Sequence, residues 1–129
     1  MTREPPASAT PSSPFPQLRV HETAGRTVVQ LIGEIDFAVV LRVTAPLDTL
    51  TAGPRPDLVI DLGPVDFLDC SGLGLLCRVR RRTEERGGRL TLVCTDPGVL
   101  KLLRIVKLRT VFHVVDALDD ALESRRPAS

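Results

Sequence analysis

Hydrophobic positions along the chain follow two periods, one typical of strands and one typical of helices. Short apolar or alternating runs predict strands at residues 18–23, 27–32, 58–62, 89–94 and 111–114. Apolar residues three or four positions apart predict amphipathic helices at residues 37–50, 72–86 and 116–123, and a further helix from Pro97. Because strands alternate with helices, we expect an α/β fold with a largely parallel sheet.

Residues at the ends of these runs indicate how the elements connect. Only Ala24-Gly25-Arg26 separates the first two strands, which predicts a β-hairpin. Gly33-Glu34-Ile35-Asp36 is expected to end the second strand and to supply, in its aspartate, the cap of the next helix. Asp96 and Pro97 are the expected cap and first residue of the third helix. Residues 63–69 are expected to form the loop that crosses from the third strand to its helix.

Prolines mark the parts of the chain where regular structure is least expected. Residues 1–17 hold five prolines among Ser, Thr and Ala, and this composition predicts a disordered tail. A single folded domain is expected over residues 18–124, followed by a second disordered tail at 125–129. Pro46 lies inside the first predicted helix, where proline costs about 3 kcal/mol or forces a kink.

Composition narrows the possible functions. A chain of 129 residues is sized for one hydrophobic core. Its net charge of +1 gives no global attraction to nucleic acid or to an anionic membrane, and neither is expected as a partner. Arginines crowd residues 78–86, but Glu84 and Glu85 interrupt them, so this is expected to be a solvated helix face. No apolar run reaches the length of a membrane span, and the three cysteines lack a Cys-x-x-Cys pair, so a reducing, cytoplasmic location is expected.

The most informative segment is Asp69-Cys70-Ser71-Gly72-Leu73-Gly74, between the third strand and the second helix. Ser71 is expected to cap this helix through its hydroxyl. Gly72 and Gly74 each cost roughly 1 kcal/mol against alanine inside a helix, so a structural role alone explains them poorly. Glycines there allow close approach by another molecule, and a helix N-terminus favours an anion such as phosphate. The segment therefore indicates a modifiable hydroxyl.

The sequence offers little for catalysis. It contains no Gly-x-Ser-x-Gly elbow, no Cys-x5-Arg phosphatase pattern, no Gly-x4-Gly-Lys-Ser/Thr phosphate loop and no zinc spacing of Cys and His. No catalytic residue, cofactor or metal is therefore expected. An enzyme that uses Cys70 as nucleophile is kept as a minor hypothesis.

These residues together resemble a known family. Residues 58–76, with Gly33-Glu34-Ile35-Asp36 upstream and Arg86-Gly87-Gly88-Arg89-Leu90 downstream, are similar to the STAS domain of bacterial anti-sigma factor antagonists, over roughly residues 18–122. In that family, the serine before the glycine of Asp-Ser-Ser-Gly-Leu-Gly is phosphorylated by a partner that is both anti-sigma factor and kinase. The resemblance implies one STAS domain, with an N-terminal hairpin, packed helices and a mixed, mostly parallel sheet of four to five strands.

The resemblance also implies a site. Ser71 matches the phosphorylated serine. The residues implied to contact the partner are Glu34, Asp36, Asp66, Asp69, Cys70, Gly72, Leu73 and Gly74. Asp66 and Asp69 have two readings, as ordinary turn residues or as a carboxylate that orients the Ser71 hydroxyl for phosphoryl transfer. Leu73 is more typical of a core residue, and becomes a contact only if it faces outward.

Two positions depart from the family pattern. Cys70 replaces the usual first serine, and Lys107 stands where glycine is common, so that helix end is expected to lack its left-handed cap. The leading hypothesis is that the unmodified protein binds a kinase-type anti-sigma factor and releases a sigma factor. Phosphorylation of Ser71 then switches binding off, and a phosphatase resets it. The alternative is a non-switching STAS scaffold or small-ligand module in which Ser71 only caps a helix.

Overall fold

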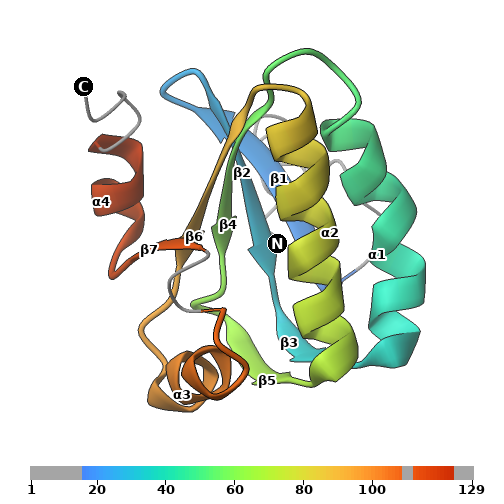
Figure 1. Cartoon of the computed structure of the whole chain (residues 1–129), viewed down its shortest axis with the longest axis vertical. Helices are drawn as coiled ribbons and strands as arrows, with labels where there is room; N and C mark the ends of the chain where they lie inside the picture. Colours follow the sequence, from blue (N-terminus) through green and yellow to red (C-terminus); the bar gives the residue numbers. More distant parts are fainter. Residues whose placement is uncertain (1–15, 109–111, 124–129) are drawn as a thin grey trace, which may run out of the picture.

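A five-stranded sheet in the order β1-β2-β4-β6-β7 forms the centre of the computed structural model, which describes residues 16–108 and 112–123 (Figure 1). The strands are β1 Leu18–Thr23, β2 Arg26–Leu31, β4 Asp57–Asp61, β6 Arg89–Val93 and β7 His113–Val115. Among the described strand pairs of this sheet, only the β1–β2 hairpin is antiparallel. Its two-residue turn uses positive φ at Ala24 (54°) and Gly25 (76°), the backbone that matches strand twist in tight hairpins. The expected mixed, mostly parallel sheet is confirmed.

A second, two-stranded sheet pairs β3 (Gly33–Ile35) with β5 (Val65–Leu68) in parallel. The expectation that residues 63–69 form only a loop is therefore wrong. The expectation that residues 33–36 simply end the second strand is also wrong, because β2 ends at Leu31 and the chain turns at Gly33, with a φ of 83°, as β3 begins. Each of these short strands is stabilised by a partner about thirty residues away, which the local hydrophobic period does not reveal.

Four helices pack around the sheet (Figure 1). They are α1 Phe37–Leu50, α2 Cys70–Glu85, α3 Pro97–Ile105 and α4 Leu118–Glu123. Helices α1 and α2 lie side by side on one face, and α4 lies on the other. The main core fills the space under α1 and α2, and a smaller cluster of Val28, Val59, Val93 and Ala121 lies under α4. Helix α3 lies at the end of the sheet where β5 runs.

Helix α1 runs unbroken through Pro46. Proline cannot donate to the carbonyl of Arg42, four residues earlier, and Arg42 is exposed, so water can reach that carbonyl. The helix ends at Leu50, with Thr51 as its C-terminal cap.

Helix α3 ends in a left-handed cap although the residue there is a lysine. Lys107 adopts a φ of 64°. Its amide donates to the Arg104 carbonyl at 3.0 Å, and the Leu108 amide donates to the Leu103 carbonyl at 2.8 Å. These are the two hydrogen bonds of a Schellman motif. The expectation that Lys107 removes this cap is therefore wrong, because the pair of hydrogen bonds holds a non-glycine residue in the left-handed region.

A buried arginine joins the sheet to α4. Arg26 is 1 % exposed. Its Nε donates to Asp57 Oδ1 at 2.8 Å, Nη2 lies 3.5 Å from Thr91 Oγ1, and Nη1 donates to the Ala121 carbonyl. This guanidinium thus connects β2, β4, β6 and α4.

The predicted ends of the domain fall partly outside the described residues. Residues 1–15 and 124–129 lie there, as does Val111 of the last predicted strand. The Gln17 carbonyl accepts from the Ile32 amide at 2.9 Å, so Gln17 is part of the folded unit rather than of a tail. Among the described helices, none has both the length and the apolar character to cross a membrane.

Candidate functional site

The candidate site lies where β3 and β5 each lead into a helix through an aspartate. Asp36 Oδ1 accepts from the Val39 amide at 3.1 Å and begins α1. Asp69 Oδ1 accepts from the Gly72 amide at 3.0 Å and begins α2. Because β3 and β5 are parallel neighbours, the two helices start at the same end of the molecule (Figure 1). This places the expected partner residues at the carboxyl ends of strands, where α/β proteins commonly bind ligands.

Ser71 is not the cap of its helix, and that expectation is wrong. Asp69 is the cap, with extended backbone, and α2 begins at Cys70. Both aspartate and serine are preferred caps, so spacing alone could not choose between positions 69 and 71. Ser71 instead occupies the second helical position, half-buried, and its hydroxyl donates to Asp69 Oδ1 at 2.5 Å.

The hydrogen bond from Ser71 lowers the pKa of the Asp69 carboxyl below its usual value, and the bond from the Gly72 amide adds to this effect. Asp69 is therefore ionised at neutral pH. Because the single hydroxyl proton of Ser71 is directed to Asp69, the lone pairs of Ser71 Oγ stay available. The arrangement suits a hydroxyl that attacks an electrophile while a carboxylate receives its proton. Asp69, and not Asp66, is the carboxylate that contacts this hydroxyl.

The two glycines of the motif have different roles. A Cβ on Gly72 would lie 2.4 Å from Leu68 Cδ1 and 3.3 Å from the Ile35 carbonyl oxygen, so Gly72 permits close packing of α2 on the β3–β5 pair. A Cβ on Gly74 would meet nothing within 4 Å. Close approach by another molecule is therefore an explanation for exposed Gly74 and not for buried Gly72.

Exposed apolar side chains flank this turn. Phe37 is 61 % exposed and Leu41 is 64 % exposed, although their spacing suggested core positions. Leu41 lies two helical turns before Asp48, which contacts Arg78 of α2. Figure 1 shows that α1 and α2 run in the same direction. Because Ser71 likewise lies two helical turns before Arg78, Leu41 is level with the turn that holds Ser71.

Seven of the eight expected partner residues separate into three groups, and the eighth is the exposed Gly74 described above. Glu34 and Asp36 line a groove beside the start of α1. Asp66, Asp69 and Cys70 line another groove, between β5 and α3. Gly72 and Leu73 are buried in the core, so neither offers a side chain to the surface. The partner surface that the sequence implied is thus divided across both sides of the β3–β5 pair.

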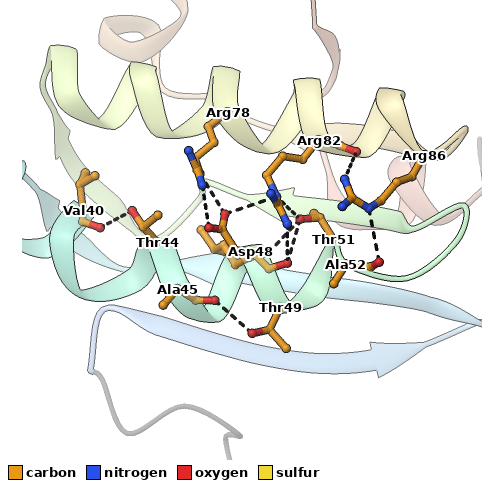
Figure 2. Close-up of polar contacts among 11 residues, drawn as sticks. Val40, Thr44, Ala45, Asp48, Thr49, Thr51, Ala52, Arg78, Arg82 and Arg86 are labelled. Carbon is orange, nitrogen blue, oxygen red and sulfur yellow. Dashed lines mark hydrogen bonds and ion pairs between the residues drawn. The ribbon is translucent and has the colours of Figure 1, made fainter.

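The other half of α2 is bound tightly to α1 (Figure 2). Arg78 donates from Nε and Nη2 to the two oxygens of Asp48, at 2.9 and 2.7 Å. Arg82 donates from Nε to Thr51 Oγ1 at 2.8 Å and from Nη2 to the Asp48 carbonyl at 3.1 Å. Hydrogen bonding from Arg78 lowers the pKa of Asp48. We call these four residues the α1–α2 clamp.

The clamp accounts for much of the basic character of α2. Arg78 and Arg82 belong to it, and Arg80 pairs with Glu84 at 3.3 Å. Arg86 donates to the Ala52 carbonyl at 3.3 Å. These arginines thus have intramolecular partners.

Few of the described residues at this site could bind a metal or react with a cofactor. Cys70 is an exposed thiol one residue before Ser71. Over residues 16–108 and 112–123, no three Cys, His, Asp or Glu side chains gather closely enough to hold a metal ion.

Comparisons with known proteins agree with this architecture. The STAS domain family matches residues 16–121. The chain is 25% identical over 107 residues to an anti-sigma F factor antagonist of Paenibacillus polymyxa, covering 82% of this chain and 92% of the relative. The structure resembles an anti-sigma factor antagonist from Mycobacterium paratuberculosis with a TM-score of 0.77 and 29% identity, covering 85% of this chain and 93% of that one.

A further solved structure is that of a phosphorylated protein. The Bacillus cell fate determinant SpoIIAA in its phosphorylated form matches with a TM-score of 0.69 and 25% identity, covering 84% of this chain and 99% of that one. The protein belongs to the STAS domain family, and the relatives from Paenibacillus polymyxa and Mycobacterium paratuberculosis are named as anti-sigma factor antagonists.

Proposed function

We propose that this protein is an anti-sigma factor antagonist whose binding is switched by phosphorylation of Ser71. The observation that carries the proposal is the geometry of that residue. Its hydroxyl lies at the start of α2 and donates to an ionised carboxylate, Asp69. Membership of the STAS family and the match to a phosphorylated relative support the assignment.

In the unmodified state, the surface around Ser71 binds an anti-sigma factor that is also a serine kinase. Exposed Phe37 and Leu41 supply apolar contact area, and Gly74 leaves room for the partner to approach. Glu34 and Asp36 form the acidic edge of this surface on the α1 side. A sigma factor held by the same anti-sigma factor is thereby released, in the cytoplasm where transcription occurs.

The kinase supplies the nucleotide, and Ser71 Oγ accepts its terminal phosphoryl group. Asp69 positions the hydroxyl and receives its proton as the new P–O bond forms and the bond to the leaving nucleoside diphosphate breaks. Asp69 then releases that proton to water, and the product carries about two negative charges next to the ionised carboxylate. Repulsion and the cost of desolvating those charges oppose rebinding, and a loss of about 3 kcal/mol weakens affinity more than a hundredfold. A phosphatase restores the starting state.

The modification is tested by incubating the full chain with each kinase-type anti-sigma factor of the same genome and Mg-ATP, followed by mass spectrometry of proteolytic peptides. We expect one phosphate, on Ser71, from at least one kinase. Ser71→Ala is expected to remain unmodified, and Cys70→Ser, which leaves the acceptor in place, to be modified. Phosphate on another residue, or none with any kinase, contradicts the proposal and favours a non-switching STAS scaffold or a small-ligand module.

The binding consequence is measured by calorimetry with the kinase found in this way. Ser71→Ala is expected to bind as the unmodified protein does, since it adds no charge. Ser71→Asp is expected to bind more weakly, because it adds one negative charge beside Asp69. Equal affinity of the Asp variant and the unmodified protein would remove the electrostatic basis of the switch.

A further inference from the structure

A groove separates the β5–α2 junction from α3. Its volume is about 450 Å³, and residues of β5, the start of α2 and the first two turns of α3 line it. Ser71 is not among the lining residues, although Asp69 and Cys70 are. The groove thus adjoins the proposed switch without containing the modified hydroxyl.

The walls of this groove are apolar and partly open to solvent. Phe67 of β5 is 53 % exposed within it. Leu102 of α3 forms the facing wall and is half-buried. Ile105 lies three residues further along α3, on the same helical face, and is 64 % exposed. These three side chains form an apolar strip that extends from the groove onto the surface.

The rim of the groove is acidic. Asp66, Asp69 and Asp96 all line it, and none of the lining residues is Lys, Arg or His. Asp69 and Asp96 cap α2 and α3 through bonds to the Gly72 and Val99 amides. Asp66 lies inside a strand and is exposed, so its carboxylate is the one best placed to meet a visiting cation.

We propose that this groove binds an arginine side chain of the anti-sigma factor, next to an apolar residue of the same segment. This inference rests on the proposed function and names the chemistry of the partner. The aliphatic stem of an arginine suits the apolar wall at Leu102, and its guanidinium can stack on the Phe67 ring while pairing with Asp66. The apolar residue next to this arginine in the anti-sigma factor packs against Ile105.

This assignment gives Ser71 and the groove, on two sides of the α2 N-terminus, different roles in binding. Phosphate on Ser71 changes whether the partner binds, whereas the groove selects which segment binds. An arginine is favoured over a lysine because its planar cation is less strongly hydrated and stacks on aromatic rings. An acidic segment is excluded by repulsion from the three carboxylates.

The groove is tested without any anti-sigma factor by NMR titration of the isotopically labelled full chain with acetyl-Leu-Arg-amide. The matched probe is acetyl-Leu-citrulline-amide, which has nearly the same shape and no charge. For the arginine peptide, we expect amide shifts concentrated at Phe67, Leu102 and Ile105. The citrulline peptide is expected to bind about threefold more weakly, the size of an exposed ion pair. Equal affinities, or shifts concentrated elsewhere, overturn the proposal.

Variants assign the interaction to particular side chains. Asp66→Asn is expected to remove the preference for arginine over citrulline, and Phe67→Ala to weaken both peptides. The matched control for the carboxylate is Asp116→Asn, which alters an exposed aspartate outside the groove and is expected to leave both affinities unchanged. Retained dispersion of the amide spectrum verifies that each variant is folded. A preference that survives Asp66→Asn would overturn the assignment to that carboxylate.

The two proposals fail separately. The peptide test uses no kinase and no phosphate. If the kinase experiment found Ser71 unmodified, the result of the peptide titration would therefore still be valid. In the same way, a groove that binds neither peptide would not contradict the phosphorylation of Ser71.

Discussion

The two halves of α2 are held to the molecule in different ways. The first turn packs through a glycine against Leu68 and the Ile35 carbonyl, and ends in an exposed surface that carries Ser71 and Gly74. The second half is fixed to α1 by the α1–α2 clamp, with Arg78 bonded to both oxygens of Asp48 (Figure 2). The first half leaves Gly74 exposed and Ser71 half-buried, whereas in the second half Arg78 and Arg82 are paired with residues of α1.

This difference shows how a small domain can hold the Ser71 hydroxyl in one position without burying it completely. Ser71 stays partly exposed because the rigidity of its helix comes from contacts elsewhere: Gly72 beneath it and the clamp two turns away. Fixed elements at both sides of a site are what a precise recognition surface requires. The comparison can be tested by disturbing each half in turn.

The largest effect is expected from Gly72→Ala. The new Cβ would lie 2.4 Å from Leu68 Cδ1, and Leu68 is itself buried, so side chains or backbone must move. Overpacking of this kind costs typically about 2 kcal/mol, more than the helix propensity gained from alanine. We expect a lower urea midpoint with an unchanged m-value.

Gly74→Ala is the matched control for this variant. Its Cβ would meet nothing within 4 Å, so the helix gains propensity and stability rises by up to about 1 kcal/mol. If both alanine variants changed the urea midpoint alike, the assignment of Gly72 to internal packing would be wrong.

A smaller loss, about 1 to 2 kcal/mol, is expected from Arg82→Met in the clamped half. Methionine retains much of the aliphatic contact of arginine, but the hydrogen bonds to Thr51 Oγ1 and the Asp48 carbonyl disappear. Arg81→Met is the control, because Arg81 is exposed on the same helix. Thermal unfolding measures both variants. An equal change in the two variants would mean that the clamp contributes nothing measurable.

The smallest effect concerns acid stability. The pKa values of Asp48 and Asp69 are both lowered in the folded protein, by the hydrogen bonds from Arg78 and Ser71 respectively. Each contribution to stability is therefore present above the unfolded pKa, about 4, and is lost as pH falls through the lower folded value. Asp48→Asn is expected to flatten the decline in urea midpoint below pH 4. A decline identical to that of the unsubstituted protein would contradict this origin.

The period of apolar residues predicted the central sheet and four helices well. Strands 18–23 and 27–32 were expected as a hairpin, and the structure confirms them with small shifts at their ends. The caps at Asp36 and Asp96 are also confirmed, since each accepts from an amide three residues later. These features depend on local chemistry, which the sequence displays directly.

Features that depend on distant partners were harder to predict. The pairing of β3 with β5 leaves no local hydrophobic period, and so the sequence predicts a loop where the structure has the strand Val65–Leu68. Phe37 and Leu41 share helical spacing with core residues, but α1 carries more apolar positions than one face can bury. The role of Gly72 is set by Leu68 and Ile35, one of which lies on a strand far away in sequence. The motif identified Ser71, whereas its contact with Asp69 required the structure.

The buried guanidinium of Arg26 has a consequence for how the chain folds as it is synthesised. Its partner Asp57 leaves the ribosome soon after it, but the Ala121 carbonyl follows almost a hundred residues later. Until α4 arrives, one nitrogen of that guanidinium lacks its protein acceptor, and the valines beneath α4 face water. Covering of this face of the sheet therefore waits for the last helix, and a nascent chain halted before Ala121 would leave these valines exposed to water.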